Sequence, residues 1–432
     1  MKILIENGRV IDPASGLDKV CSLAIAAGRV IGVDAIPQDF APSRVIDARG
    51  CLVLPGLVDL AARLREPGHE HEGMLESEMA AAVAGGVTSL VCPPDTDPVL
   101  DEPGLVEMLK FRAEKLHQAR LFPLGALTRG LAGEVLTEMA ELTDSGCVGF
   151  SQADVALAST QVTQRALQYA ATFGYTVWLR PQELHLGRGV AASGPLATRL
   201  GLAGVPVAAE TIALHTIFEL MKTTGVRVHL CRLSSGAGVA LVRAAKAQGL
   251  PVTCDVSINS LLLTDMDIGY FDSRARLIPP LRQERDRAAL AAGLADGTID
   301  ALVSDHTPVD EDAKHLPFAE AEPGATGLEL LLSIALKWSR DARVQLPRAL
   351  ATVTSAPAGV LGGALGTFAA SCGRITAGGV ADLAIVDPEA WWTVEPKALA
   401  SQGKHTPFGG LELPGRVRMT LVGGQIAFEA QG

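Results

Sequence analysis

Charged residues follow several short apolar runs of the sequence, at positions where they could form a site. The stretch "DLAARLREPG", Asp59–Gly68, opens with an acid and carries Arg63 and Arg65 ahead of a Pro-Gly turn. Many enzymes build their sites from charged side chains on the loop after a strand. Yet Ala61 and Ala62 offer no reactive group, and a protonated arginine has no lone pair for a metal ion. The stretch therefore has the position of a site without the residue types that catalysis needs.

Alternating β-rich and helical segments must position these residues. Between about Leu52 and Trp338, Ala/Leu/Glu-rich segments with helical spacing separate eight β-rich runs. Many helical segments end in a glycine, which readily takes the left-handed conformation at a helix end. Eight β-then-α units predict an α/β fold of the (β/α)8 barrel type, with an open doubly wound sheet as the alternative. The predicted strands are Leu57–Leu60, Val87–Cys92, Arg120–Leu127, Cys147–Phe150, Tyr175–Leu179, Val226–Leu233, Val252–Val256 and Asp300–Ser304, and the glycines are Gly86, Gly146, Gly174, Gly225, Gly249 and Gly297.

The two ends of the chain have a different pattern. Residues 1–51 contain period-two runs broken by Asn-Gly, Ala-Gly and Pro, which are hairpin signals, and residues 369–432 are also rich in predicted strands. We expect the two segments to pair into one small β-sandwich domain beside a barrel that spans residues 52–368.

Composition bounds the class of protein. The chain has 432 residues, 48% hydrophobic and 20% charged, which is typical of a folded globular protein. A formal charge of −11 without a basic run argues against nucleic acid or an anionic membrane as the main partner. No signal peptide and no transmembrane helix are predicted. Seven cysteines without a Cys-x-x-Cys pair indicate reduced thiols and a cytoplasmic protein.

The carboxyl ends of barrel strands are where functional residues lie. The predicted strand ends bring charged side chains of both signs to one bowl. These side chains are Arg63, Arg65, Arg180, Arg232 and Asp305.

Several motifs identify a family at this point. The chain resembles the dihydroorotases of the amidohydrolase superfamily over essentially its whole length. The resemblance rests on "PGLVDLAARLREPG", "CPPDTDPVLDEP", "RVHLCRLSS", "CDVSINSLLLTD", "IPPLR", "DGTIDALVSDHTP", "GGVADLAIVDP" and "KHTPFGGLELPGRV". It implies a (β/α)8 barrel with a β-sandwich built from both termini, in agreement with the pattern above.

The positions that bind metal in active members of this family hold other residues here. The resemblance places Ala61 and Arg63 where active members have His-x-His after strand 1. Arg180 and Arg232 stand where the metal-binding histidines follow strands 5 and 6. Of these vestigial metal positions, only Asp305, after strand 8, is kept.

A family carboxylate or modified lysine after strand 4 falls within "SQAD", where Gln152-Ala153 aligns and Asp154 lies just beyond. Substrate-side positions change as well. The resemblance assigns them to Arg65, which is retained, and to Asp95, Ile278 and Val309, which are not.

Arginine cannot replace histidine as a zinc ligand, because zinc needs neutral nitrogen, sulfur or oxygen donors. We therefore predict that no metal binds here and that the arginines form a network with Asp305 through forked hydrogen bonds. The neighbouring arginines should lower the pKa of Asp305. Asp95 should lie close enough to Arg65 to compete with a substrate carboxylate for its guanidinium group. A second His-x-His, His69–His71, is expected to be a surface loop.

Without a metal there is no activated water, so we expect dihydroorotase activity to be absent. The resemblance implies a non-catalytic group of dihydroorotase-like chains that assemble with aspartate transcarbamoylase. In that group, six copies of each chain combine, two catalytic trimers being joined by three dimers of the dihydroorotase-like chain. Two alternatives remain: an enzyme of altered, metal-independent chemistry, and a regulatory module that senses an anion in the arginine-rich bowl.

Overall fold

Largely buried parallel strands form the centre of the molecule, in the computed structural model, which describes residues 1–430. Every residue of β7 and β11 is buried, as expected of parallel strands covered on both faces. All eight predicted strands are present. They are β6 (Leu57–Asp59), β7 (Val87–Cys92), β8 (Arg120–Pro123) continued by β9 (Gly125–Ala126), β10 (Phe150–Ser151), β11 (Thr176–Leu179), β14 (Arg227–Leu230), β15 (Val252–Ser257) and β16 (Ala301–Val303).

The strands pair in chain order and return to the first strand. Hydrogen bonds join β6 to β7 and β7 to β8. They also join β9, β10, β11, β14, β15 and β16 in succession. Ala62 then forms a parallel bridge with His306, and the carboxylate of Asp59 accepts a hydrogen bond from the Ser304 N–H at 3.1 Å. The chain thus has the predicted α/β class, with the strand order of a (β/α)8 barrel.

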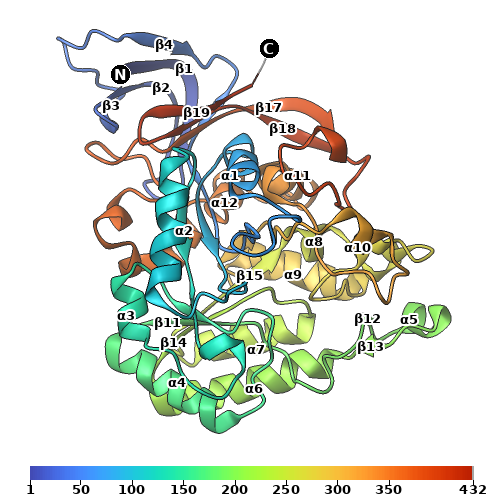
Figure 1. Cartoon of the computed structure of the whole chain (residues 1–432). Helices are drawn as coiled ribbons and strands as arrows, with labels where there is room; N and C mark the ends of the chain where they lie inside the picture. Colours follow the sequence, from blue (N-terminus) through green and yellow to red (C-terminus); the bar gives the residue numbers. More distant parts are fainter. Residues whose placement is uncertain (431–432) are drawn as a thin grey trace.

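Helices surround these strands (Figure 1). Three of the glycines predicted to end helices, Gly174, Gly225 and Gly297, cap them in the left-handed conformation with φ of 74°, 69° and 86°. The longer helices are α1 (Leu75–Ala84), α2 (Pro103–Lys115), α4 (Thr160–Phe173), α6 (Val207–Thr224), α7 (Gly236–Ala247), α9 (Glu284–Asp296) and α11 (Leu331–Asp341).

Shorter elements complete this part of the chain. A small two-stranded sheet, β12 (Ala191–Ala192) with β13 (Gly204–Val205), flanks α5 (Pro195–Leu200), which lies at the far right of Figure 1. The other short helices are α3 (Met139–Asp144), α8 (Ile258–Leu262), α10 (Glu311–His315), α12 (Leu346–Ala351) and α13 (Ser355–Leu361), with 3-10 turns η1 (Arg129–Leu131), η2 (Asp265–Ile268), η3 (Ser273–Ala275), η4 (Leu328–Leu330), η5 (Gly362–Ala370) and η6 (Pro396–Ala398).

Both ends of the chain contribute to one sheet at the top of Figure 1. Its order is β19-β18-β17-β5-β1-β2-β3, with β4 beside β1. Hydrogen bonds join all eight strands, and Arg29 of β3 forms a further antiparallel bridge with Val380, beside β17. The two terminal segments therefore pair with each other, as predicted. Ile5, Leu23 and Leu383 belong to a core that this sheet has for itself. The strands are β1 (Lys2–Asp12), β2 (Leu17–Ala26), β3 (Arg29–Val33), β4 (Arg44–Asp47), β5 (Leu52–Pro55), β17 (Leu383–Thr393), β18 (Glu412–Val422) and β19 (Gln425–Glu429).

Strand β5 lies in this sheet because it pairs with both β1 and β17. The predicted boundary at residue 51 had assigned these residues to the barrel. The terminal sheet therefore continues to Pro55, and the chain enters β6 directly after it.

One helical stretch, Leu346–Ala370, is long and apolar enough to cross a membrane by composition alone. In the structure it is divided among α12, α13 and η5, and 56% of its most apolar window is buried. Helix α13 packs against β6 and β16. This burial inside the fold explains its apolar composition.

Two glutamates fasten a C-terminal loop to the barrel. Glu329, in η4, accepts hydrogen bonds from the N–H groups of Ala400 and Ser401 at 2.8 and 3.3 Å. Glu78, in α1, accepts one from the Ser401 hydroxyl at 2.6 Å and contacts a ring nitrogen of His306 at 2.7 Å. The terminal segment is thereby tied to the residues that follow β16.

Glu329 should make stability depend on pH. Burial raises its pKa to about 7 from the usual 4.5. The folded protein then holds the proton more tightly than the unfolded chain does. The stabilisation is complete below about pH 4.5 and is lost as pH rises through about 7.

We therefore expect Glu329→Gln, which keeps an acceptor without the charge, to lose this dependence. Relative to the native chain, the variant should gain on the order of 2 kcal/mol of unfolding free energy between pH 5 and pH 8. Urea unfolding at both pH values measures it. Glu107→Gln, at an exposed position of α2, is the control, and an identical response of both variants would refute the assignment.

Candidate functional site

Six charged side chains meet beyond the carboxyl ends of the barrel strands. Each follows a different strand, so the fold gathers residues that are far apart in sequence. They are Arg63 after β6, Asp95 after β7, Asp154 after β10, Arg180 after β11, Arg232 after β14 and Asp305 after β16.

Asp154 is the centre of this arginine–aspartate network. It receives Arg63 Nη2 at 2.8 Å and Arg180 Nε at 2.5 Å, and it also pairs with Arg232 Nη2. Arg180 Nη2 donates in addition to the Asp154 backbone carbonyl at 2.9 Å. Three guanidinium groups therefore share one carboxylate.

The two other aspartates complete the network. Arg63 Nε donates to Asp95 at 2.8 Å, and Arg232 Nη1 donates to Asp305 at 2.9 Å. Arg232 Nη1 also reaches the Ile278 carbonyl at 3.3 Å. With three arginines facing three aspartates, the formal charge of the network is zero.

Burial makes this charge balance necessary. Arg63, Arg232 and Asp305 are only 7%, 5% and 6% exposed, and an unpaired charge at such depth would cost several kcal/mol. Burial alone would raise the pKa of Asp154, but the charges of Arg232, Arg63 and Arg180 outweigh it and hold that pKa well below its usual range. Asp154 is therefore a permanent anion under physiological conditions.

Asp305 behaves differently from our prediction. We expected its arginine neighbours to lower its pKa, but burial raises the pKa of Asp305, and the charges of Arg232 and Arg63 offset burial only in part. The sequence argument counted the nearby charges and omitted the loss of water around a residue that is 6% exposed.

Asp95 also has a different partner from the one predicted. It pairs with Arg63, whereas Arg65 forms an ion pair with Glu72 at 2.7 Å and donates to the Pro308 carbonyl at 2.7 Å. Arg65 has a positive φ of 64°, which turns this residue out of the regular course of the chain. Asp95 and Arg65 thus belong to two separate sets of contacts.

The remaining predicted positions carry no charge into the network. Ala61 packs against the core between β6 and its neighbours, and its carbonyl accepts the His306 N–H at 3.2 Å. Ile278 contributes only its carbonyl. Val309 is 3% exposed and lines a cavity that also contains Glu72.

The sequence analysis did not commit to Asp154. Gln152, which the family alignment favours, turns into its own loop, where it accepts from Thr128 at 3.0 Å and donates to the Leu131 carbonyl at 2.7 Å. The signal that could have found Asp154 is charge balance, because three buried arginines need more than one carboxylate.

A divalent metal ion does not fit these residues. The guanidinium groups of Arg63, Arg180 and Arg232 have no lone pair to donate and would repel the ion. Both carboxylate oxygens of Asp154 are already bound by arginines. The network therefore provides no ligand set at which a metal could activate water.

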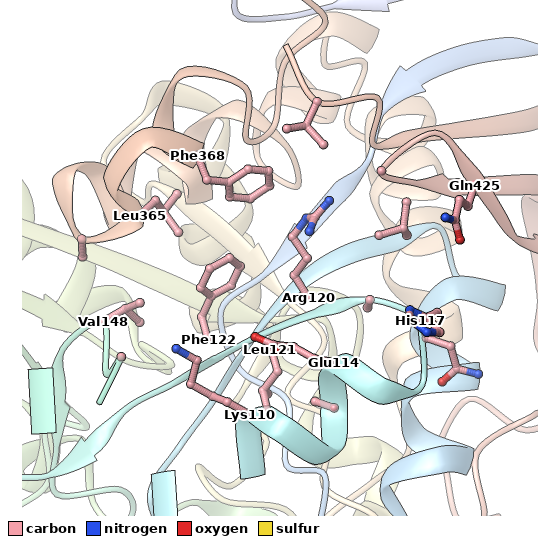
Figure 2. A pocket seen from close by; sticks show the side chains of 18 residues that line it. Lys110, Glu114, His117, Arg120, Leu121, Phe122, Val148, Leu365, Phe368 and Gln425 are labelled. Atoms are coloured by element: carbon pink, nitrogen blue, oxygen red, sulfur yellow. The ribbon is translucent and has the colours of Figure 1, made fainter. Parts of the chain in front are cut away.

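A further cavity, of about 570 Å³, lies at the opposite, amino end of the strands (Figure 2). Arg120, at the start of β8, lies there beside the rings of Phe122 and Phe368. It donates two hydrogen bonds to Asp382 at 3.0 and 3.1 Å, next to β17. These hydrogen bonds pair the guanidinium with a carboxylate. They also join the barrel strands to the terminal sheet.

Comparison with known proteins gives the family. A model described as Dihydro-orotase-like matches residues 50–237. The chain is 45% identical to the Dihydroorotase-like protein of Pseudomonas aeruginosa, over 99% of this chain and 100% of the relative. It is 43% identical to the Dihydroorotase-like protein of Pseudomonas putida, over 99% of each chain. It is 40% identical to the Dihydroorotase of Anaeromyxobacter sp. (strain K), over 99% and 98%. The chain belongs to the dihydroorotase-like family.

Solved structures agree on the fold. The L-hydantoinase (dihydropyrimidinase) of Arthrobacter aurescens matches with a TM-score of 0.88 at 24% identity, over 99% of this chain and 96% of that one. The D-hydantoinase (dihydropyrimidinase) of a Thermus species matches with a TM-score of 0.84 at 22% identity, over 99% and 95%. These matches extend over the barrel strands and the terminal sheet together.

Removing one member of the network should be costly. Arg232→Ala leaves Asp154 and Asp305 buried with less compensation, and breaking a buried pair costs about 3–5 kcal/mol. We expect a loss of that order in the free energy of unfolding, measured by urea denaturation at pH 7. The control is Arg243→Ala, whose ion pair with Asp296 is 50% and 49% exposed and should be worth less than about 1 kcal/mol. Equal losses in the two variants would contradict the structural role of the network.

Proposed function

We propose that this member of the dihydroorotase-like family is catalytically inactive and acts as a structural subunit that assembles with aspartate transcarbamoylase in pyrimidine biosynthesis. The observation that carries the proposal is the arginine–aspartate network, which lies where the family resemblance puts the metal ligands. The barrel is intact, but paired side chains occupy its mouth. This combination favours a function of the outer surface over a function of the barrel mouth.

The chemistry supports inactivity. Metal-dependent hydrolysis needs a bound ion that lowers the pKa of water and polarises the substrate. Here Arg63, Arg180 and Arg232 hold the positions that histidines have in active members. Asp305, the one retained ligand, is hydrogen bonded to Arg232 at 2.9 Å. Arg65, the family's contact for a substrate carboxylate, is paired with Glu72.

The names of the relatives also support the proposal. Those at 45% and 43% identity are called Dihydroorotase-like protein, and those at 40% and below are called Dihydroorotase. Names alone do not decide activity, so the proposal rests on the residues of the network.

The alternatives use the same arginines for an anion, as substrate or as regulator. The charge balance opposes them, because each guanidinium already binds an aspartate and an incoming anion would have to displace Asp154 or Asp95. Displacement would expose a buried carboxylate to a second negative charge, which is unfavourable at low dielectric. The assembly role needs no such rearrangement.

The purified chain should not interconvert carbamoyl aspartate and dihydroorotate, with or without added zinc. We expect rates at the level of the reaction without protein, because the network leaves no free set of ligands for a metal ion. A spectrophotometric assay against an active dihydroorotase at equal concentration measures this. Turnover that increases with the amount of chain and disappears in Arg232→Ala would refute the proposed inactivity.

Co-expression should reveal the partner. An affinity tag on the aspartate transcarbamoylase catalytic chain of the same genome should retain this chain through size-exclusion chromatography. Light scattering should give the mass of six copies of each. The control is the same tagged chain co-expressed with an active dihydroorotase from a species whose two enzymes are separate. Separate elution of the two chains at micromolar concentration would refute the assembly role.

A further inference from the structure

The loop between β6 and α1 gathers histidine and glutamate side chains, which are residue types that commonly bind metal ions. It contains the sequence His69-Glu70-His71-Glu72, outside the arginine–aspartate network. One ring nitrogen of each histidine and a carboxylate oxygen of Glu72 all lie within 4.8 Å of one another. We predicted a surface loop because no second cluster of ligands pairs with the two histidines, and the structure places the carboxylate of the adjacent Glu72 beside them.

Backbone hydrogen bonds fix the shape of this loop. The His69 N–H donates to the Arg65 carbonyl at 2.8 Å, and the Glu72 N–H donates to the His69 carbonyl at 2.9 Å. From the C-terminal loop, Gln402 Nε2 donates to the carbonyls of Glu70 and His71, each at 3.0 Å. Ligands on a loop held in this way need little rearrangement to bind an ion.

Glu72 is positioned as a shared carboxylate. It is 4% exposed, and its Oε2 lies 2.7 Å from Arg65 Nε. Its other carboxylate oxygen, Oε1, lies 4.0 Å from His71 Nε2. An ion at Oε1 would therefore find a carboxylate already oriented by a partner behind it, as metal-ligating carboxylates commonly are.

Open space adjoins the cluster. His71 and Glu72 line a cavity of about 760 Å³ together with Asp310 and His405. Three protein ligands leave at least one coordination position of a tetrahedral ion free, and the cavity can supply water to it. A site of this kind is open, in contrast to the four-ligand sites that only stabilise a fold.

We propose that His69, His71 and Glu72 bind one divalent transition-metal ion, with Zn²⁺ as the fitting example. Two imidazole nitrogens and one carboxylate oxygen suit Zn²⁺, Ni²⁺ or Cu²⁺, whereas Mg²⁺ and Ca²⁺ prefer all-oxygen ligands. The site adjoins the Arg65–Glu72 ion pair and shares no residue with the arginine–aspartate network. It depends neither on the proposed inactivity nor on the proposed assembly.

Metal titration tests the site directly. The full chain, with any purification tag removed and stripped of metal by a chelator, is titrated with ZnCl₂ by calorimetry in excess Mg²⁺. We expect one Zn²⁺ per chain with a Kd in the micromolar range or below. Co²⁺ in place of Zn²⁺ should give visible absorption bands that saturate at the same ratio. Absence of saturable binding, or displacement of Zn²⁺ by Mg²⁺, would overturn the proposal.

Variants then locate the ion. His69→Ala and His71→Ala should each weaken Zn²⁺ binding by at least about tenfold, since each removes one of three ligands. His215→Ala, at an exposed position of α6, is the matched control and should bind as the native chain does. Circular dichroism melting checks that all three variants remain folded. Binding that persists unchanged in His69→Ala and His71→Ala would place the ion elsewhere and refute the assignment.

Discussion

Three guanidinium groups converge on the carboxylate of Asp154, and the rest of the barrel mouth is arranged around that contact. A buried arginine is tolerated only when carboxylates compensate its charge and accept its hydrogen bonds. Asp154 alone cannot compensate three cations, so Asp95 and Asp305 are required as well. Under the proposed function, the positive charge of these side chains takes the place that a metal ion has in active members of the family. The three arginines and three aspartates balance each other and leave no free ligand set for a metal ion.

The backbone at the strand ends is adapted to this network. Ala153, Arg232 and Asp305 have positive φ angles of 50°, 55° and 51°, which non-glycine residues adopt only where their surroundings impose them. Arg232 and Asp305 pair with each other, and Ala153 immediately precedes Asp154. The hydrogen bonds of the network therefore stabilise a conformation that the isolated strand ends would avoid. The hydrogen bonds of the network and the backbone conformation of the strand ends therefore depend on each other, and neither follows from any single residue.

Much of the frame, and less of the site, could be predicted from the sequence. Apolar β-rich runs and the glycines that follow helices are local signals, so the eight strands and caps such as Gly174 were found. The arginines were identified because the family resemblance gives the positions of the metal ligands in active members. The role of Asp154, the pairing of Asp95 with Arg63 and the raised pKa of Asp305 depend on distances and burial across separate strands. The pairing of the two terminal segments was predicted from their strand-rich patterns, but the place of β5 was not, because it depends on pairing with β1 and with the distant β17.

Arg65 connects the strand end after β6 to the loop that follows it. The family resemblance assigns this side chain to a substrate carboxylate, whereas in the structure it pairs with the carboxylate of Glu72. An internal partner is always present, so it outcompetes a dilute external anion unless the anion brings much additional binding energy. Arg65 also holds the loop that carries His69 and His71, because its backbone carbonyl accepts a hydrogen bond from the His69 N–H at 2.8 Å. Arg65 therefore has a structural role through Glu72 and Pro308, and under the proposed function this role explains why the residue is present without the reaction.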